Sequence, residues 1–288
     1  MPQFVLLPRD ALQGLRLGIS VSESPDLLRL GLLESHFRLA LGEITRCILI
    51  AGGRLAYGGH LRPDGYTSFL LGELERYSRR DRPLRVCLAY SEHRRMTLDD
   101  IERQKRRLGL NGEIVCLNSA GEPIAANFER DNEPFEVDAE QRKQSLTSLR
   151  RHMIEQTHGR VLIGGKRRDF FGAMPGLLEE SIMACERGQP LYFAGGFGGI
   201  TWDIARALDI DKGDWFQPLP SEPATDPRVL DGLQRLNAAA RKTNHQSLDN
   251  GLTAEENRRL AATHRPSEIA ALLSIGLGRK FARPAVSP

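Results

Sequence analysis

The chain has 288 residues, of which 40% are hydrophobic and 27% are charged, so it has enough apolar surface to fold around a core. Forty Lys and Arg residues stand against 37 Asp and Glu residues, which leaves a formal net charge of +3. Such a balance is typical of an evenly mixed, solvated surface and argues against a nucleic acid partner.

The cysteines and the apolar runs indicate the compartment. Cys47, Cys87, Cys116 and Cys185 lie in apolar runs and lack the spacing of a zinc site, so we expect buried free thiols and no metal. The N-terminus lacks a basic-then-apolar signal pattern, and no apolar run nears the ~20 residues that cross a bilayer. We therefore expect a cytoplasmic protein that does not associate with membranes.

Apolar runs alternate with helical patterns up to about residue 208. The runs predict strands at 15–21, 54–57, 84–90, 113–117, 160–164 and 190–194. Helices are predicted between them, at about 25–51, 68–80, 97–109, 138–158, 176–187 and 200–207. The alternation predicts an α/β fold with a doubly wound, mainly parallel, Rossmann-like sheet.

Two segments depart from this alternation. Residues 118–137 are irregular and long for a loop in an α/β domain, which indicates a lid, a binding loop or a partner contact. Residues 211–227 hold four prolines, a linker composition, and helices are predicted after them at about 227–242, 253–263 and 266–276. We predict a Rossmann-like domain at 1–210, followed by a linker and C-terminal helices at 211–288.

Three of the predicted strands, those near residues 57, 163 and 194, run directly into paired glycines. Glycine lets the backbone turn sharply and approach a ligand, an approach that a β-carbon at Gly165 is expected to block. In a doubly wound sheet such exits lie at the carboxyl ends of the strands, where ligands bind. The expected ligand-binding residues are Ser20, Ser22, Gly58, Gly59, Gly164, Gly165, Lys166, Pro175, Gly176, Gly195 and Gly196.

The chemistry of these residues favours an anionic ligand. Lys166 is cationic, and the helix expected after Gly176 begins with free N–H groups at the positive end of its dipole. Ser20 and Ser22 carry hydroxyls that can bind phosphate or cap a helix. The glycines from Gly195 onward do not follow the GxGxxG spacing, so no redox dinucleotide, and no other cofactor, is predicted.

Three stretches, Ser145–Met153, Val161–Lys166 and Phe171–Glu180, together resemble the SLOG superfamily. This is the Rossmannoid group that joins the DprA/Smf proteins and the LOG cytokinin-activating hydrolases. The prokaryotic branch related to the N-terminal domains of melastatin-type channels is the most similar in character. The resemblance covers roughly residues 14–210 and implies a nucleotide-like ligand over the strand ends. It also implies self-association, for which Ile269, Leu272, Leu273, Ile275 and Leu277 offer an apolar surface.

In LOG enzymes an arginine and a glutamate cleave a base–ribose bond. By position, Arg150 or Arg151 matches the arginine, and Glu179 or Glu180 matches the glutamate. Adjacent residues on a helix point in different directions, so at most one glutamate is expected to face the site while the other is solvated. The chain lacks the PGGxGT signature of these hydrolases, which favours binding over catalysis.

The sequence thus leaves two functions open. The first is a sensor or effector domain that binds a nucleotide or a nucleotide-derived signal of the NAD or ADP-ribose type. The alternative is a LOG-like hydrolase of a nucleotide N-glycosidic bond, with Glu179 or Glu180 stabilising the positive ribose as the bond breaks.

Overall fold

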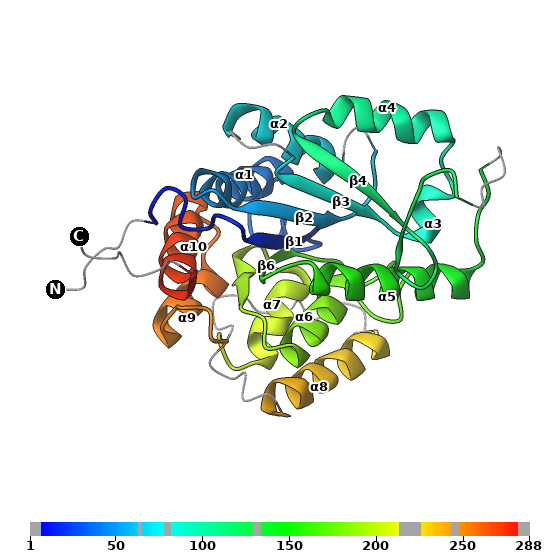
Figure 1. Cartoon of the computed structure of the whole chain (residues 1–288). Coiled ribbons are helices and arrows are strands. Elements are labelled where there is room, and N and C mark those ends of the chain that lie inside the picture. Colours follow the sequence, from blue (N-terminus) through cyan, green and yellow to red (C-terminus); the bar gives the residue numbers. More distant parts are fainter. Residues whose placement is uncertain are drawn as a thin grey trace.

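The computed structural model describes residues 7–62, 65–77, 82–128, 134–212, 226–242 and 248–281. Within them, seven strands form one sheet in the order β5-β4-β3-β2-β1-β6-β7 (Figure 1). The strands are β1 (Arg16–Ser22), β2 (Arg54–Gly58), β3 (Leu84–Leu88), β4 (Gly112–Leu117), β5 (Pro123–Ile124), β6 (Gly159–Gly164) and β7 (Leu191–Ala194). The helices are α1 (Glu34–Ile50), α2 (Tyr66–Tyr77), α3 (Tyr90–His93), α4 (Leu98–Leu108), α5 (Ala139–Glu155), α6 (Gly176–Glu186), α7 (Gly199–Ala207), α8 (Pro227–Lys242), α9 (Ala254–Ala262) and α10 (Pro266–Phe281), with a short 3-10 turn, η1 (Gly195–Phe197).

Every strand pairing in this sheet is parallel except that of β5 with β4. Helices cover both faces, with α1, α2 and α10 on one side and α5, α6 and α8 on the other (Figure 1). This arrangement confirms the predicted doubly wound, mainly parallel fold. The short strand β5 was not predicted, because two residues are too few to show a periodic pattern.

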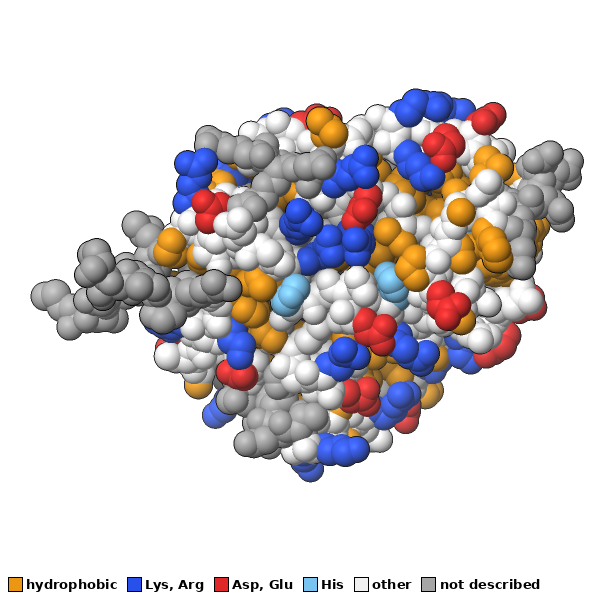
Figure 2. Space-filling model, in the orientation of Figure 1, with side chains coloured by type: hydrophobic (Ala, Val, Ile, Leu, Met, Phe, Trp, Pro, Cys, Tyr) orange, Lys and Arg blue, Asp and Glu red, His pale blue; other side chains and the backbone are white. Residues whose placement is uncertain are grey.

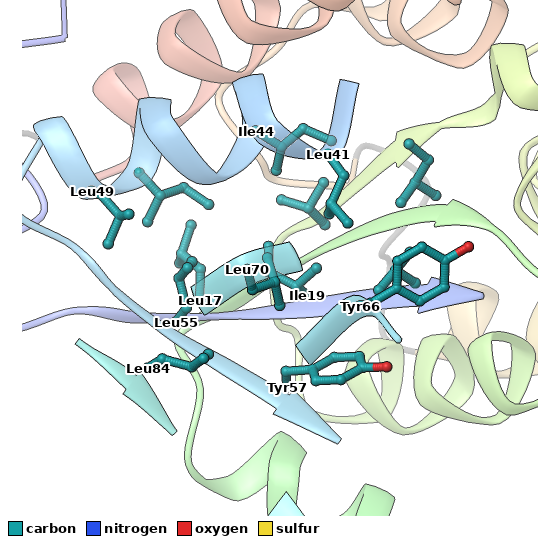
Figure 3. Close-up of a cluster of buried hydrophobic side chains, with 14 of the residues drawn as sticks. Leu17, Ile19, Leu41, Ile44, Leu49, Leu55, Tyr57, Tyr66, Leu70 and Leu84 are labelled. Atoms are coloured by element: carbon teal, nitrogen blue, oxygen red, sulfur yellow. The ribbon is translucent and has the colours of Figure 1, made fainter. Parts of the chain in front are cut away.

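The larger core lies between the sheet and α1. Alternate strand residues point to one face, so Leu17 and Ile19 of β1 meet Leu41 and Ile44 of α1 (Figure 3). All four side chains are almost completely buried, and each contributes roughly 1.5–3 kcal/mol relative to an exposed position. A second core on the opposite face packs around Leu162 of β6.

The first helix begins later than its sequence predicts, at Glu34 rather than near residue 25. The Ser24 hydroxyl donates to the carbonyl of Phe197 (2.6 Å), and the Asp26 carboxylate accepts the N–H of Gly199 (2.7 Å). These contacts draw the chain after β1 toward the β7–α7 connection. Residues 25–31 therefore form turns, and α1 starts only at Glu34.

The C-terminal helices pack against the sheet domain. Helix α8 lies against α6, α9 against β7, and α10 against α1. In the apolar set expected on α10, four residues are buried and Ile275 is partly buried. The set thus packs within the chain and does not offer the free surface that was expected. Self-association and the domain division at residue 210 stay predictions, and most of the expected linker, residues 213–225, lies outside the described residues.

Candidate functional site

The strand order reverses between β1 and β6, which lie side by side in the middle of the sheet. The chain leaves β1 toward one face and β6 toward the other, so their carboxyl ends flank the crevice where doubly wound folds bind ligands. The Gly165 N–H donates to the carbonyl of Ser22 (3.0 Å), and Gly164 and Gly165 have φ of +70° and +104°. The sharp turn predicted at these glycines is therefore present at the switch point.

Two ion pairs cross this crevice. Lys166 pairs with Glu23 (3.0 Å), and Arg167 pairs with Asp26 (2.7 Å). Arg167 also donates twice to Asp203 of α7, over 2.6 and 3.0 Å. Because Asp26 also accepts the first N–H of α7, a carboxylate of the chain itself occupies the positive end of that helix.

The charges around Arg167 are strongly coupled. Burial alone would lower the pKa of Arg167, but hydrogen bonds and charge contacts with Asp203 and Asp26 outweigh burial and raise it. Burial raises the pKa of Asp203, which Arg167 offsets only in part. Arg167 therefore stays protonated and fixed between two carboxylates.

A cavity of about 1020 Å³ opens from this crevice toward α7 and α8. Its apolar wall includes Trp202, Val229 and Leu233, and the Arg206 guanidinium lies 4.8 Å from the centre of the Trp202 ring. Its polar wall includes the ion-paired residues Glu23, Asp26, Lys166, Arg167 and Asp203. The volume suits a ligand of nucleotide to dinucleotide size.

The two candidate glutamates have different partners. Arg150 of α5 donates to the Glu179 carboxylate, and the Thr147 hydroxyl does so over 2.7 Å. Glu180 accepts hydrogen bonds from Ser20 and from Arg160 (2.6 Å). The expectation that one glutamate would be solvated is wrong, since the Glu179 and Glu180 side chains are only 9% and 15% exposed.

Arg150 is the arginine that reaches the α6 N-terminus. A β-carbon on Gly172 or Gly176 would lie 2.9 or 2.8 Å from its guanidinium nitrogens, so these glycines make room for it. Pro175, just before the helix, is buried. Arg151 is exposed and lines a separate groove of about 400 Å³ between α5, α6 and α8, which Glu179 also lines.

Arg160 is a residue that sequence reasoning missed. It lies on β6, fully buried, and its Nη1 donates to Ser20 (2.8 Å) and Glu180 (2.6 Å). Gly18, its partner on β1, leaves the necessary space, because a β-carbon there would lie 2.7 Å from Cζ of Arg160. Burial lowers the pKa of Arg160, and the charge of Glu180 acts against this. The sequence feature that could have identified it is an arginine within an apolar strand. That Arg160 lies opposite a glycine becomes visible only from the register of β1 and β6.

The other expected glycines pack against protein. A β-carbon on Gly58 would touch Leu149 at 3.4 Å, and one on Gly59 would overlap the Tyr57 ring at 2.3 Å. Gly195 and Gly196 face the backbone around the end of α9, where β-carbons would come within 2.5 Å of Ala261 O and 2.1 Å of Thr263 O. The structure thus gathers Ser22, Gly164, Gly165 and Lys166 at the switch point, whereas it places Gly195 and Gly196 against α9.

The described residues show whether the chain has a metal site, disulfides or a membrane-spanning helix. There, no three His, Cys, Asp or Glu side chains are placed to hold a metal ion. All four cysteines are free thiols, and burial raises the pKa of Cys87 and of Cys185 to about 12. In the same residues, no helix is both long enough and apolar enough to cross a bilayer.

Comparison with known families agrees with this architecture. The model of the family described as SLOG cluster2 matches residues 11–260, which is most of the chain and includes the crevice, both glutamates and α8. Comparison with curated proteins finds no match. The chain therefore belongs to the SLOG superfamily, in the family described as SLOG cluster2.

Proposed function

We propose that this protein binds a nucleotide-derived ligand of the NAD or ADP-ribose type at the carboxyl edge of its sheet, as a sensor or effector domain. The observation that carries the proposal is the crevice between β1 and β6, which opens into the cavity of about 1020 Å³. Membership of the SLOG superfamily supports a nucleotide-related ligand.

The walls of the cavity match the parts of such a ligand. Lys166 and Arg167 can bind phosphate oxygens, and the apolar wall beside Trp202 can hold a base. Carboxylates such as Asp203 can accept hydrogen bonds from ribose hydroxyls, as acidic residues do in dinucleotide folds. Each component of a nucleotide thus has a chemically suitable wall.

Lys166 is the cation that a ligand can recruit most easily. Its side chain is 44% exposed and its partner Glu23 is 69% exposed. A solvated pair of this kind contributes only ~0–1 kcal/mol, so a phosphate can replace Glu23 with little loss. Arg167 is more buried and held by two carboxylates, so it gives the crevice a fixed charge.

Lys166→Ala tests the proposal by calorimetric titration with ADP-ribose, NAD and AMP. We expect the affinity for the bound nucleotide to fall about tenfold, as for the loss of one charged hydrogen bond. Lys143→Ala is the matched control, because Lys143 is 41% exposed and pairs with Glu140 over 3.3 Å. Equal affinities in the two variants, or no binding of any nucleotide by the wild type, would contradict the proposal.

Hydrolysis of a nucleotide N-glycosidic bond is the second candidate. The pair of Arg150 and Glu179 at the start of α6 favours it, because a carboxylate beside the ribose stabilises the charge that develops there. Both glutamates are, however, already held by arginines of the chain, which favours binding.

Chromatography after incubation with nucleoside monophosphates, NAD and ADP-ribose separates the two functions. Free base formed by the wild type but lost in Glu179→Gln or Glu180→Gln would establish hydrolysis, with turnover reduced roughly 10²-fold or more. Nucleotide binding without any free base would leave the sensor function.

A further inference from the structure

A cluster of arginines lies at the amino edge of the sheet, opposite the proposed ligand site. Arg16 begins β1, Arg54 begins β2, and Arg85 is the second residue of β3. Arg16 pairs in register with Arg54, and Ala56, two residues along β2, pairs with Arg85. Side chains in this register share one face, so all three leave the sheet on the side covered by α5. Figure 2 shows Lys and Arg side chains gathered near the centre of the visible surface of the molecule, above α5.

The charges of this cluster are not balanced. One oxygen of Glu113 accepts from Arg85 Nε (2.6 Å) and lies 3.9 Å from Arg16 Nη2. Arg85 also donates to the side-chain oxygen of Gln156 (3.1 Å). Arg54 is exposed and forms no ion pair with any described residue. Counted over the residues that the structure describes, three guanidinium groups and one carboxylate leave a local charge of +2.

Burial and the neighbouring guanidinium groups both act on the pKa of Arg16. Burial and then the charge of Arg85 lower the pKa of Arg16, the charge of Arg54 adds to this, and Glu113 opposes it. The Nε atom of Arg16 is buried without a hydrogen-bond partner in the described structure. Like charges on paired strand residues are destabilising, so an added anion here would stabilise the fold.

The cluster also has the geometry for an anion. The side chains of Arg16 and Arg85 are 14% and 22% exposed and are held by Glu113, so they present guanidinium groups that are already ordered. Arg54 is free to close over a ligand from the neighbouring strand. Guanidinium forks match the oxygens of phosphate, and their charges favour a dianion over a halide.

We propose that Arg16, Arg54 and Arg85 form a second anion site, which binds a phosphate group or a similarly compact dianion. The site does not depend on the ligand proposed for the carboxyl edge. Because Arg54 is exposed, both inorganic phosphate and the terminal phosphate of a nucleotide are suitable probes of the site.

Thermal unfolding and calorimetry at constant pH and ionic strength test the site, with sodium phosphate, AMP and sodium chloride as the added salts. We expect phosphate to raise the Tm of the wild type by roughly 2 °C or more above chloride. Arg54→Ala should unfold at the same or a higher temperature in chloride, because a repulsive charge is removed, and should lose this phosphate response. Its phosphate affinity should fall about tenfold or more, while Arg54→Lys should retain part of it.

Two control variants distinguish phosphate binding at the amino edge from phosphate binding elsewhere on the protein. Arg235→Ala removes an exposed arginine of α8 that has no ion pair in the described structure, and it should keep the full response. Lys166→Ala, at the carboxyl edge, should also keep it. An equal Tm in phosphate and chloride, or a phosphate response lost in Lys166→Ala but kept in Arg54→Ala, would overturn the inference. A response to AMP but not to phosphate would likewise overturn it.

Discussion

The carboxyl and amino edges of the sheet both carry basic side chains, but they balance the charge differently. At the carboxyl edge Arg167 lies between Asp26 and Asp203. At the amino edge Arg54 has no ion pair in the described structure. An anion at the carboxyl edge must therefore displace a carboxylate of the chain, whereas at the amino edge no described carboxylate has to be displaced from Arg54.

This difference implies different selectivity at the two edges. Displacing Asp26 from Arg167 and from the α7 N-terminus requires a ligand that makes further contacts in the cavity, such as a nucleotide. The arginines of the amino edge need only a compact dianion. The comparison teaches that the number of cations is a poor guide to ligand size, because the partners already present decide what can bind.

The largest effect is expected at Arg160, which lies inside the sheet between the two edges. Arg160→Met leaves the Glu180 carboxylate largely buried without its cation, so we expect the free energy of unfolding to fall by about 3–5 kcal/mol. The double variant Arg160→Met/Glu180→Gln should recover most of this loss. Urea unfolding measures both variants.

Arg259→Met is the control for Arg160→Met, because Arg259 forms an exposed pair with Glu268. Its loss should be under about 1 kcal/mol. If Arg160→Met were as mild as this control, the buried pair would not stabilise the fold, and charge inside the sheet would matter no more than charge at its edges.

A smaller effect is expected at Gly165, where a β-carbon would lie 2.2 Å from Cγ2 of Ile200 at φ of +104°. Gly165→Ala should lower the free energy of unfolding by about 2–4 kcal/mol, because backbone strain and overlap with α7 add. The earlier expectation, that a side chain here would only block the ligand, omitted this contact. Gly188→Ala, with φ of +63° and no atom within 4 Å, should lose only about 1 kcal/mol. Equal losses in denaturant unfolding would contradict the packing role of Gly165.

The smallest effect is expected at His152, beside the amino edge. Burial and then the charge of Arg85 lower its pKa from the ordinary value of 6.5, and Glu155 opposes this. As the pH falls from 6.5 toward the folded pKa, the unfolded state takes up the proton first, so stability falls. His152→Gln should remove this fall, which we expect to be under about 1 kcal/mol between pH 7 and 5. Bound phosphate should also reduce this loss of stability in the wild type, because it neutralises the charge of Arg85. The measurement is the free energy of unfolding as a function of pH. If neither His152→Gln nor added phosphate changed the pH profile of the wild type, both expectations would be contradicted.

Part of this architecture was readable from the sequence. Apolar runs that end in glycine predicted the parallel strands and the turn at Gly164 and Gly165. These features can be predicted because they depend on residues that are neighbours in the sequence. The pairing of Arg150 with Glu179 was among the alternatives, because the resemblance to LOG enzymes aligned Arg150 or Arg151 with their arginine and Glu179 or Glu180 with their glutamate.

Other features depend on register and could not be read from the chain. Arg160 is accommodated by Gly18, 142 positions earlier in the sequence, because the two residues pair across β1 and β6. The role of Asp26 depends on Gly199, and that of Gly195 depends on the end of α9. Contacts of this kind leave no periodic signal, so reasoning from local patterns missed Arg160, while ligand binding by Gly195 stays a prediction.

The short antiparallel strand β5 affects how copies of this protein can meet. It covers the carboxyl part of β4, and Pro123, one of its two residues, has no N–H to offer a further strand. The uncovered part of β4 carries Glu113, a charge that opposes edge-to-edge stacking of sheets. On the far side, α9 lies against β7. Continuous addition of strands is thus disfavoured at both ends of the sheet, as far as the described residues form those ends.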